Sequence, residues 1–288
     1  MGNTYTELQE QAKAKWEALL KGEPPRIFVG TATCGKAAGG LQVMEALRRA
    51  LSEKSIEAEI YEVGCNGLCY AEVLVDIIKS GQPRISYRNV TPEVARQLVE
   101  DYLVNDNPRP DLAIATIGEG SIDGIPNLFD LPELKPQVRV AMRNCGIIAP
   151  GEIDHYLASG GYAGLARCLT ELTPEQALEE VEKSGLRGRG GAAFSTGMKW
   201  KFIAGAPGPV KYHLCNAEEG DPGAFNDKGL LESDPHTLIE GTVLAGYATG
   251  ANRGYVFIRH GHDGPIDRTR TAVQQAHLRA PARRRPAS

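Results

Sequence analysis

Three cysteines are the first residues whose types and spacing could support chemistry. Cys65 and Cys69 are separated by three residues in the run Gly64-Cys65-Asn66-Gly67-Leu68-Cys69, and Cys34 lies upstream in a glycine- and alanine-rich turn. Clustered cysteines without the spacing of a secreted disulfide framework more often serve metal or redox chemistry. A thiol oxidoreductase is disfavoured because the spacing is not C-x-x-C. Two ordinary buried cysteines remain the alternative for Cys65 and Cys69.

A glycine-rich run is the second candidate. Gly188-Arg189-Gly190-Gly191-Ala192-Ala193 formally fits the dinucleotide pattern G-x-G-x-x-G/A. That pattern needs a strand before it, but a helix is predicted here, so a Rossmann-type site is not predicted. Glycines still let a planar or phosphorylated ligand approach the backbone, and exposed amides can hold anions. A tight turn without a ligand is the alternative.

Charged and aromatic residues surround this run. Positive charge comes from Arg187, Arg189 and Lys199, and rings that could stack on a ligand come from Phe194, Trp200 and Phe202. Downstream, Asn216-Ala217-Glu218-Glu219-Gly220-Asp221 follows a predicted strand and holds three carboxylates in four residues. A solvated acidic turn is the alternative for that segment.

Together the two runs are more specific than either alone. Residues 184–200 (SGLRGRGGAAFSTGMKW) and 215–225 (CNAEEGDPGAF) resemble the FMN- and NADH-binding 51 kDa-like subunit of respiratory complex I. The same module occurs in NAD-reducing hydrogenases (the diaphorase subunit) and in the beta subunits of NAD-dependent formate dehydrogenases. Residues 232–236 (ESDPH) and 254–259 (GYVFIR) extend the resemblance, which runs from about Asp111 to about Gln275.

The resemblance implies roles for particular residues. FMN would be bound by Gly188, Arg189, Gly190, Gly191, Lys199, Asn216, Glu218 and Glu219. NADH would be bound by Phe194, Phe202 and Asp221. A hydride would pass from NADH to FMN, and electrons would pass on to iron–sulfur clusters, so no side chain is assigned a catalytic role. Three departures from the family affect the flavin geometry, namely Ala193 for glycine, Ser195 for proline and Glu218 for aspartate.

The N-terminal part resembles the thioredoxin-like ferredoxin domain fused to these flavoproteins. That domain holds a [2Fe-2S] cluster with four thiolates in C-x4-C and C-x3-C patterns. If Cys34 is the second ligand, position 29 should be the first, and it is Val29, which cannot ligate. Cys34, Cys65 and Cys69 remain as metal ligands. A cluster with a borrowed fourth ligand and a cluster-free scaffold both stay open.

The order of helices and strands expected from the sequence predicts an α/β fold throughout. We expect an N-terminal helix at 1–25, a thioredoxin-like ferredoxin-type domain at 26–104 and a connector at 105–170. The first part of an α/β FMN-binding domain should follow at 171–276, and a disordered basic tail at 277–288. Cys145, Cys168 and Cys215 are interpreted as small buried residues, and His155, His213 and His236 as structural or surface residues.

Composition limits the function classes. The net charge is −4, and the last twelve residues carry four arginines and no acid, so the body of the chain is acidic. An acidic body argues against nucleic acid as a partner. No apolar run is long enough to span a membrane, and no signal peptide is apparent, so a cytoplasmic location is expected.

The predicted function is an NADH-oxidising flavoprotein module with FMN and NAD(H) as cofactors, and a [2Fe-2S] cluster is a further cofactor if the N-terminal cysteines hold one. Its partners would be the other subunits of an NAD-linked oxidoreductase. The family's flavin domain continues past Gln275, so we expect a C-terminally truncated chain. The alternative is therefore a non-catalytic fragment that acts at most as a docking scaffold, and the sequence leaves open whether the chain is an enzyme.

Overall fold

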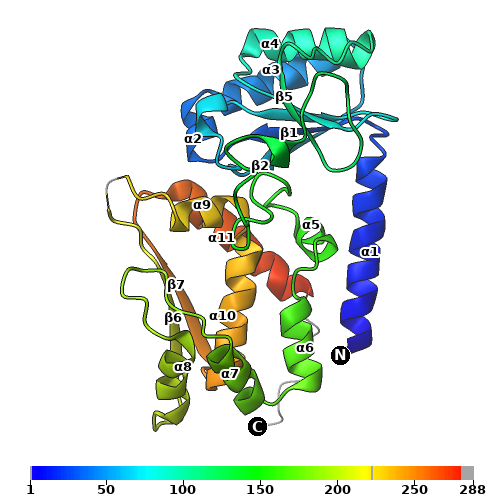
Figure 1. Cartoon of the computed structure of the whole chain (residues 1–288). Coiled ribbons are helices and arrows are strands. Elements are labelled where there is room, and N and C mark those ends of the chain that lie inside the picture. Colours follow the sequence, from blue (N-terminus) through cyan, green and yellow to red (C-terminus); the bar gives the residue numbers. More distant parts are fainter. Residues whose placement is uncertain (1, 222, 280–288) are drawn as a thin grey trace.

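The computed structural model describes residues 2–221 and 223–279 (Figure 1). The chain opens with helix α1 (Gly2–Leu20), which ends just before Gly22, Pro24 and Pro25. Glycine and proline cannot easily continue a helix, which accounts for this end. One face of α1 packs on helix α5 (Ile153–Ala158), where Ala12 contacts Ile153 and Leu157.

A five-stranded sheet forms the first unit. Its strands are β1 (Arg26–Gly30), β2 (Glu59–Val63), β3 (Val75–Ile78), β4 (Arg84–Tyr87) and β5 (Ala113–Ile117), in the order β2-β1-β3-β4-β5. Strand β2 is parallel to β1, and the other pairs are antiparallel. A β-α-β unit followed by a hairpin and a helix is a thioredoxin-like arrangement, as expected from the sequence.

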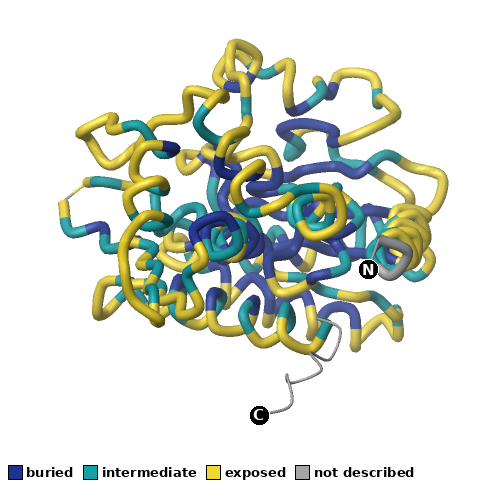
Figure 2. Tube along the Cα trace, turned by 90° about the horizontal axis from the view of Figure 1, so that it is seen from below, coloured by how far each residue is buried: buried dark blue, intermediate teal, exposed yellow. Residues whose placement is uncertain are grey.

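Two helices cover one face of this sheet. Helix α3 (Gly40–Glu53) follows the short helix α2 (Thr33–Ala37), and α4 (Pro92–Leu98) continues into a π-helical turn over Val99–Val104. Strands β1, β3 and β4 are buried at every position, and the charged residues Asp76 of β3 and Arg84 of β4 form a buried ion pair at 2.6 Å. Figure 2 shows the buried residues gathered in the interior and the exposed ones along the outer turns.

The expected connector at 105–170 is not one extended segment. Its first part supplies β5, which pairs with β4 and completes the sheet. After a 3-10 turn at Leu128–Asp130, its last part forms α5 and α6 (Ala163–Glu171). The expected boundary at residue 104 therefore falls inside the first unit.

A second unit follows. It contains α7 (Pro174–Lys183), α8 (Thr196–Gly205), β6 (Tyr212–Ala217), α9 (Asp227–Ser233), α10 (Pro235–Thr249), β7 (Arg253–Ile258) and α11 (Asp263–Arg279). Strands β6 and β7 form a two-stranded parallel sheet, and α9 and α10 make the crossover between them. Helix α11 reaches Arg279, whereas the basic tail was expected from residue 277, and the rest of that tail lies outside the described residues.

The remaining cysteines and histidines are partly corrected. Cys145 is buried, as expected, but Cys168 and Cys215 are only partly buried. Cys168 lies on α6, a helix with no fully buried residue, and Cys215 lies on β6, which is exposed on one face. His155 and His236 are buried within the protein and hydrogen-bonded, which agrees with a structural role.

Candidate functional site

The first candidate site is a cluster of three thiols at one end of the first sheet. Cys34 lies in α2, and Cys65 and Cys69 lie in the loop that follows β2. The Cys65 and Cys69 sulfur atoms are 3.6 Å apart, and the Cys34 thiol is hydrogen-bonded to Cys69. Two thiolates on one tetrahedral metal, with bonds of about 2.3 Å, lie about 3.7 Å apart. The Cys65–Cys69 spacing therefore suits two ligands of one metal ion.

Val29, at the position where the resembled domain has its first cysteine ligand, does not lie with the thiols. Val29 is fully buried in the core that β1 forms with α3, together with Val43, Leu47 and Val75. Its side chain packs against that core. The structure thus brings together the three predicted cysteines, but it gives position 29 a packing role.

Raised pKa values keep the Cys34 and Cys65 thiols protonated in the metal-free protein. Burial, followed by the hydrogen bond with Cys69, raises the pKa of Cys34 to about 11. Burial also raises the pKa of Cys65 well above its usual value. Metal binding would release these protons, because thiolates are the ligands. Within residues 2–221 and 223–279, no three His, Cys, Asp or Glu side chains are arranged to hold a single metal ion. A two-iron cluster differs in that it spreads four ligands over two irons.

Side chains of the second unit hydrogen-bond to the segments that carry the thiols. The Glu232 carboxylate accepts hydrogen bonds from the backbone N–H of Thr33 (2.9 Å) and from its hydroxyl (3.0 Å), at the first residue of α2. Arg268 on α11 donates to the Thr31 hydroxyl (2.8 Å) and to Glu62 (3.1 Å). Charge-assisted bonds of this kind are about twice as strong as neutral ones. The position of Cys34 is therefore coupled to α9 and α11.

The glycine loop is the second candidate site. It runs from Gly185 to Ser195, between α7 and α8, and is exposed along most of its length. Its ends are held by bonds from the Gly188 N–H to the Phe194 carbonyl (2.8 Å) and from the Thr196 N–H to the Leu186 carbonyl (2.9 Å). No atom lies within 4 Å of a Cβ built on Gly190 or Gly191. The backbone here is open to a ligand.

The departure at Ala193 has a structural consequence. Ala193 has a φ of +49°, in the left-handed region that favours glycine. Glycine, which the resembled family has at this position, adopts that conformation without the clash of a Cβ. Ala193 therefore holds the same loop shape at a conformational cost.

The aromatic and basic residues around the loop lie on its exposed side. The ring centroids of Phe194 and Phe202 are 6.3 Å apart with planes tilted by 37°, and both rings are at least half exposed. Lys199 is exposed on α8, and its charge adds to burial in lowering the pKa of His213 on β6. Arg187 and Arg189 are exposed as well. The predicted pair of rings is therefore assembled next to the open loop.

The acidic turn after β6 is largely occupied by its own contacts. Glu219 accepts hydrogen bonds from the backbone N–H groups of Asn226, Asp227 (3.1 Å) and Lys228 (3.1 Å), at the start of α9. Burial opposes ionisation of Glu219, but these bonds hold its pKa below the usual value. Glu218 pairs with Arg259 at 3.1 Å. Glu219 thus acts as a helix cap.

Two other predicted residues of this turn are more accessible. Asn216 is exposed at the end of β6, where its side-chain oxygen accepts from the Glu218 N–H at 3.2 Å, and Asp221 is exposed in the loop. Among the described residues, no hydrogen bond or ion pair joins this turn to the glycine loop. The two parts of the predicted flavin site therefore lie in the same unit without a direct polar link.

Sequence reasoning missed several polar residues that organise the sites. Glu240 is buried and accepts from the Tyr156 hydroxyl (2.6 Å) and from the N–H groups of Tyr162 (2.7 Å) and Leu165 (3.1 Å). Glu72, next to the thiols, has a buried side-chain oxygen. Glu232 belongs to the run 232–236 that carried part of the resemblance, but nothing in the sequence indicated its contact with Thr33.

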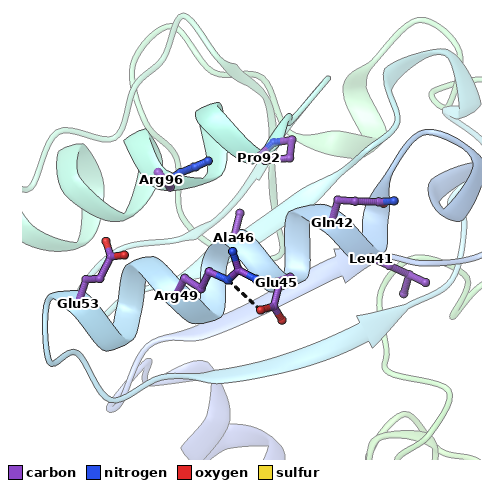
Figure 3. Close-up of a pocket in the computed structure, with 8 residues that line it drawn as sticks. All are labelled: Leu41, Gln42, Glu45, Ala46, Arg49, Glu53, Pro92 and Arg96. Atoms are coloured by element: carbon purple, nitrogen blue, oxygen red, sulfur yellow. Dashed lines mark hydrogen bonds and ion pairs between the residues drawn. The ribbon is translucent and has the colours of Figure 1, made fainter.

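An open groove lies on the first unit, away from both sites. It measures about 550 Å³ and lies between α3 and α4 (Figure 3), where Arg49 is paired with Glu45 at 2.9 Å. Charged and apolar side chains line it, among them Leu41, Glu53 and Arg96. None of the predicted site residues contributes to it.

Fold and site together define an α/β protein in which a thioredoxin-like unit with a thiol cluster packs on a second α/β unit with an open glycine loop. Residues 181–283 match the Nuo51 FMN-binding domain. This segment is thus similar to the FMN-binding domain of the 51 kDa-like flavoprotein subunits.

Individual relatives are consistent with this assignment. The HndC subunit of the NADP-reducing hydrogenase of Solidesulfovibrio fructosivorans is 49% identical over 142 residues, covering 49% of this chain and 29% of that protein. An NADH-quinone oxidoreductase subunit of Rhizobium meliloti is 46% identical over 138 residues, covering 48% and 33%. An NADH-quinone oxidoreductase subunit of Escherichia coli is 39% identical over 128 residues, covering 44% and 29%. The chain thus matches about a third of the length of these curated relatives.

Two solved structures align with the chain at low TM-scores. An NAD+-reducing [NiFe]-hydrogenase in the air-oxidized state is 19% identical with a TM-score of 0.39, covering 88% of this chain and 41% of that one. A thioredoxin-like [2Fe-2S] ferredoxin from Aquifex aeolicus is 20% identical with a TM-score of 0.29, covering 33% and 94%. Across the described residues, no helix combines the length and apolarity needed to cross a membrane.

Proposed function

We propose that this chain is an NADH-oxidising flavoprotein module of a multi-subunit NAD-linked oxidoreductase in the cytoplasm. FMN, when bound, would supply the hydride acceptor and the point from which electrons pass singly to iron–sulfur clusters. The observation that carries the proposal is the open glycine loop within the segment that matches an FMN-binding domain. Backbone groups without Cβ atoms are what a planar, phosphorylated ligand needs at close range.

The chain's own residues would bind and orient the two ligands. Gly188, Gly190 and Gly191 would lie against FMN, and Arg189 and Lys199 would offset its phosphate charge. Asn216 and Glu218 would contact it from the β6 end. Glu219 would act indirectly, since its carboxylate already caps α9. Phe194 and Phe202 would stack on the nicotinamide nucleotide, and Asp221 would accept a hydrogen bond from it.

A flavin titration tests this proposal. FMN added to the purified chain should lose fluorescence as it binds, and NADH should then bleach its visible absorption under anaerobic conditions. Gly190→Val should weaken FMN binding at least about tenfold, because its side chain would fill the space meant for the ligand. The structure offers no clash for that side chain, and Gly190 has no left-handed φ, so folding should be retained. Gly151→Val, at another open glycine, is the matched control.

A second candidate is a non-catalytic chain that only holds other subunits of such a complex. It is favoured by the acidic turn, where Glu219 and Glu218 are engaged in internal contacts. Absence of FMN uptake by a correctly folded chain would support this second function and exclude the first for the chain alone.

A further inference from the structure

A buried carboxylate without a complete set of partners lies beside the thiol cluster. Glu72 follows the short 3-10 helix that begins at Cys69, and it precedes β3. One of its oxygens, Oε2, accepts from the Leu74 N–H at 2.9 Å. The other, Oε1, is buried and has no hydrogen-bond partner. A buried carboxylate oxygen without a hydrogen-bond partner has lost its contacts with water and gained none in return, so such atoms call for an explanation.

The carboxylate is held against the segment that carries Cys34. A Cβ built on Gly30, at the end of β1, would lie 2.6 Å from Glu72 Oε2, and one built on Gly35, in α2, would lie 3.2 Å from it. Glycine at position 30 leaves room for the carboxylate, whereas a Cβ at Gly35 would first meet the Gly30 carbonyl oxygen at 2.1 Å. The negative charge of Glu72 also contributes to the raised pKa of Cys34 and of Cys65. Glu72 therefore lies next to the thiol cluster, three residues after Cys69 and against the end of β1 that leads to Cys34.

The ligand count of a two-iron, two-sulfur cluster leaves one position open. Such a cluster takes four ligands, two for each iron. The 3.6 Å spacing of Cys65 and Cys69 suits one iron, which leaves Cys34 and one further ligand for the other. Val29 cannot fill that position. The Glu232 carboxylate also lies near Cys34, but both its oxygens accept from Thr33. Of the two glutamates near Cys34, only Glu72 has a carboxylate oxygen, Oε1, that is buried without a hydrogen-bond partner.

We propose that Glu72 supplies the fourth ligand, through Oε1, of a two-iron, two-sulfur cluster whose other ligands are Cys34, Cys65 and Cys69. The proposal rests on the electron-transfer function proposed above. It accounts with one arrangement for the orphaned oxygen, for the close approach of the carboxylate to Gly30 and for the valine at position 29. A carboxylate is a harder ligand than a thiolate, so the iron it binds should differ in its spectroscopic properties from an iron with two thiolates.

Anaerobic reconstitution of the full chain with ferrous iron and sulfide tests the assignment. We expect about two irons and two sulfides per chain in the unmodified protein. Glu72→Gln, which keeps the shape but removes the charge, should retain at least about tenfold less iron after a chelator challenge. Glu72→Cys should retain the cluster and shift its absorption and electron paramagnetic resonance spectra toward those of a four-thiolate cluster. Val29→Cys should leave the spectra unchanged, because that side chain lies in the sheet core.

Matched controls separate ligation from folding. Glu57→Gln removes an exposed carboxylate from the same domain and should leave iron retention and spectra as in the unmodified protein. Thermal melting of every variant establishes that it is folded, and Glu72→Cys remains informative if Glu72→Gln unfolds.

Several results would overturn the assignment. These are unchanged spectra and iron retention in Glu72→Gln, unchanged spectra in Glu72→Cys, a four-thiolate spectrum in Val29→Cys, or no cluster in the unmodified chain. Flavin uptake, measured on the same preparations, reports separately on the proposed function. If the Glu72 variants behave as expected but the chain takes up no flavin, the proposed flavoprotein function is refuted and the assignment of Glu72 as a ligand is not.

Discussion

At the scale of single residues, the glycine loop shows a local strain with a measurable consequence. Ala193 occupies the left-handed region at φ +49°, which costs an L-residue about 1–2 kcal/mol. Glycine removes that cost but gains freedom in the unfolded chain, worth about 0.4–1 kcal/mol.

Ala193→Gly should therefore raise the free energy of unfolding by up to about 1 kcal/mol, measured by urea denaturation. Ala192→Gly is the matched control, because Ala192 has no left-handed φ, and it should lower stability or leave it unchanged. Equal effects of the two substitutions would mean that the backbone at 193 is not strained.

At the scale of elements, sequence patterns predicted the first sheet better than the second unit. Strand β1 was recognisable because it is a buried, largely apolar run that follows Pro24 and Pro25 and ends at Gly30. Helix α8 was not expected. Its apolar residues Met198, Trp200, Phe202 and Ile203 lie around the whole helix, so no one-sided stripe marks it. Strand β5 was assigned to a connector, because only its pairing with β4, far along the chain, identifies it as part of the sheet.

The candidate sites divide in the same way. Cys34, Cys65 and Cys69 could be found from residue type and spacing, and the structure brings them together. The roles of Glu72 and Glu232 could not be found in this way, because each depends on contacts between segments that only folding brings close. A single glutamate carries no signal of burial in its sequence context. Long-range polar contacts are therefore what the sequence alone leaves out.

The contact between the two units offers a test at this scale. Gly64, just before Cys65, lies against Ser233 at the end of α9, and a Cβ at Gly64 would come within 2.4 Å of the Ser233 Cα and Cβ atoms. Gly64→Ala should therefore push the units apart and lower stability by about 1–3 kcal/mol, with faster limited proteolysis between them.

Gly151→Ala, where a Cβ meets no atom within 4 Å, is the control for this substitution and should resemble the unmodified protein. If Gly64→Ala melts and is cleaved like Gly151→Ala, the close approach of α9 to the thiol loop is not present in solution.

At the scale of the whole molecule, buried histidine makes stability depend on pH. His155 lies among the rings of Trp16, Phe28 and Tyr61, and it accepts a hydrogen bond from the Ala149 N–H at 3.2 Å. Burial, followed by the nearby charge of Arg84, lowers its pKa to about 4. The unfolded chain takes up this proton near pH 6.5, whereas the folded chain resists it until about pH 4. Stability should therefore fall as the pH falls through this window.

Between pH 7.5 and pH 5, His155 alone should account for a loss of about 2 kcal/mol in the free energy of unfolding. Urea denaturation of the unmodified protein and of His155→Gln at both pH values measures this contribution. The variant should be less stable at pH 7.5 but should lose about 2 kcal/mol less on acidification. His236, whose pKa is also lowered to about 4 by burial, is present in both proteins and cancels in the comparison. A pH dependence that is the same in both proteins would contradict a buried, neutral His155.

The second unit presents an uncovered sheet face, which leads to a prediction about the surface of the whole molecule. Tyr212 and Leu214 of β6 lie beside Tyr255 and Phe257 of β7 on one face of the parallel sheet, and each of these side chains is more than half exposed. Parallel sheets are normally covered on both faces, and a contiguous apolar surface of this kind binds hydrophobic dyes.

The double substitution Leu214→Thr with Phe257→Thr should therefore lower the fluorescence of bound 1-anilinonaphthalene-8-sulfonate several-fold. It should leave the melting temperature within a few degrees, because the lost side chains bury little area. Val138→Thr, at a 91% exposed valine outside this sheet, should change neither quantity. A large drop in melting temperature for the double variant would mean that these side chains are covered in solution, and unchanged dye fluorescence would mean that the dye binds elsewhere.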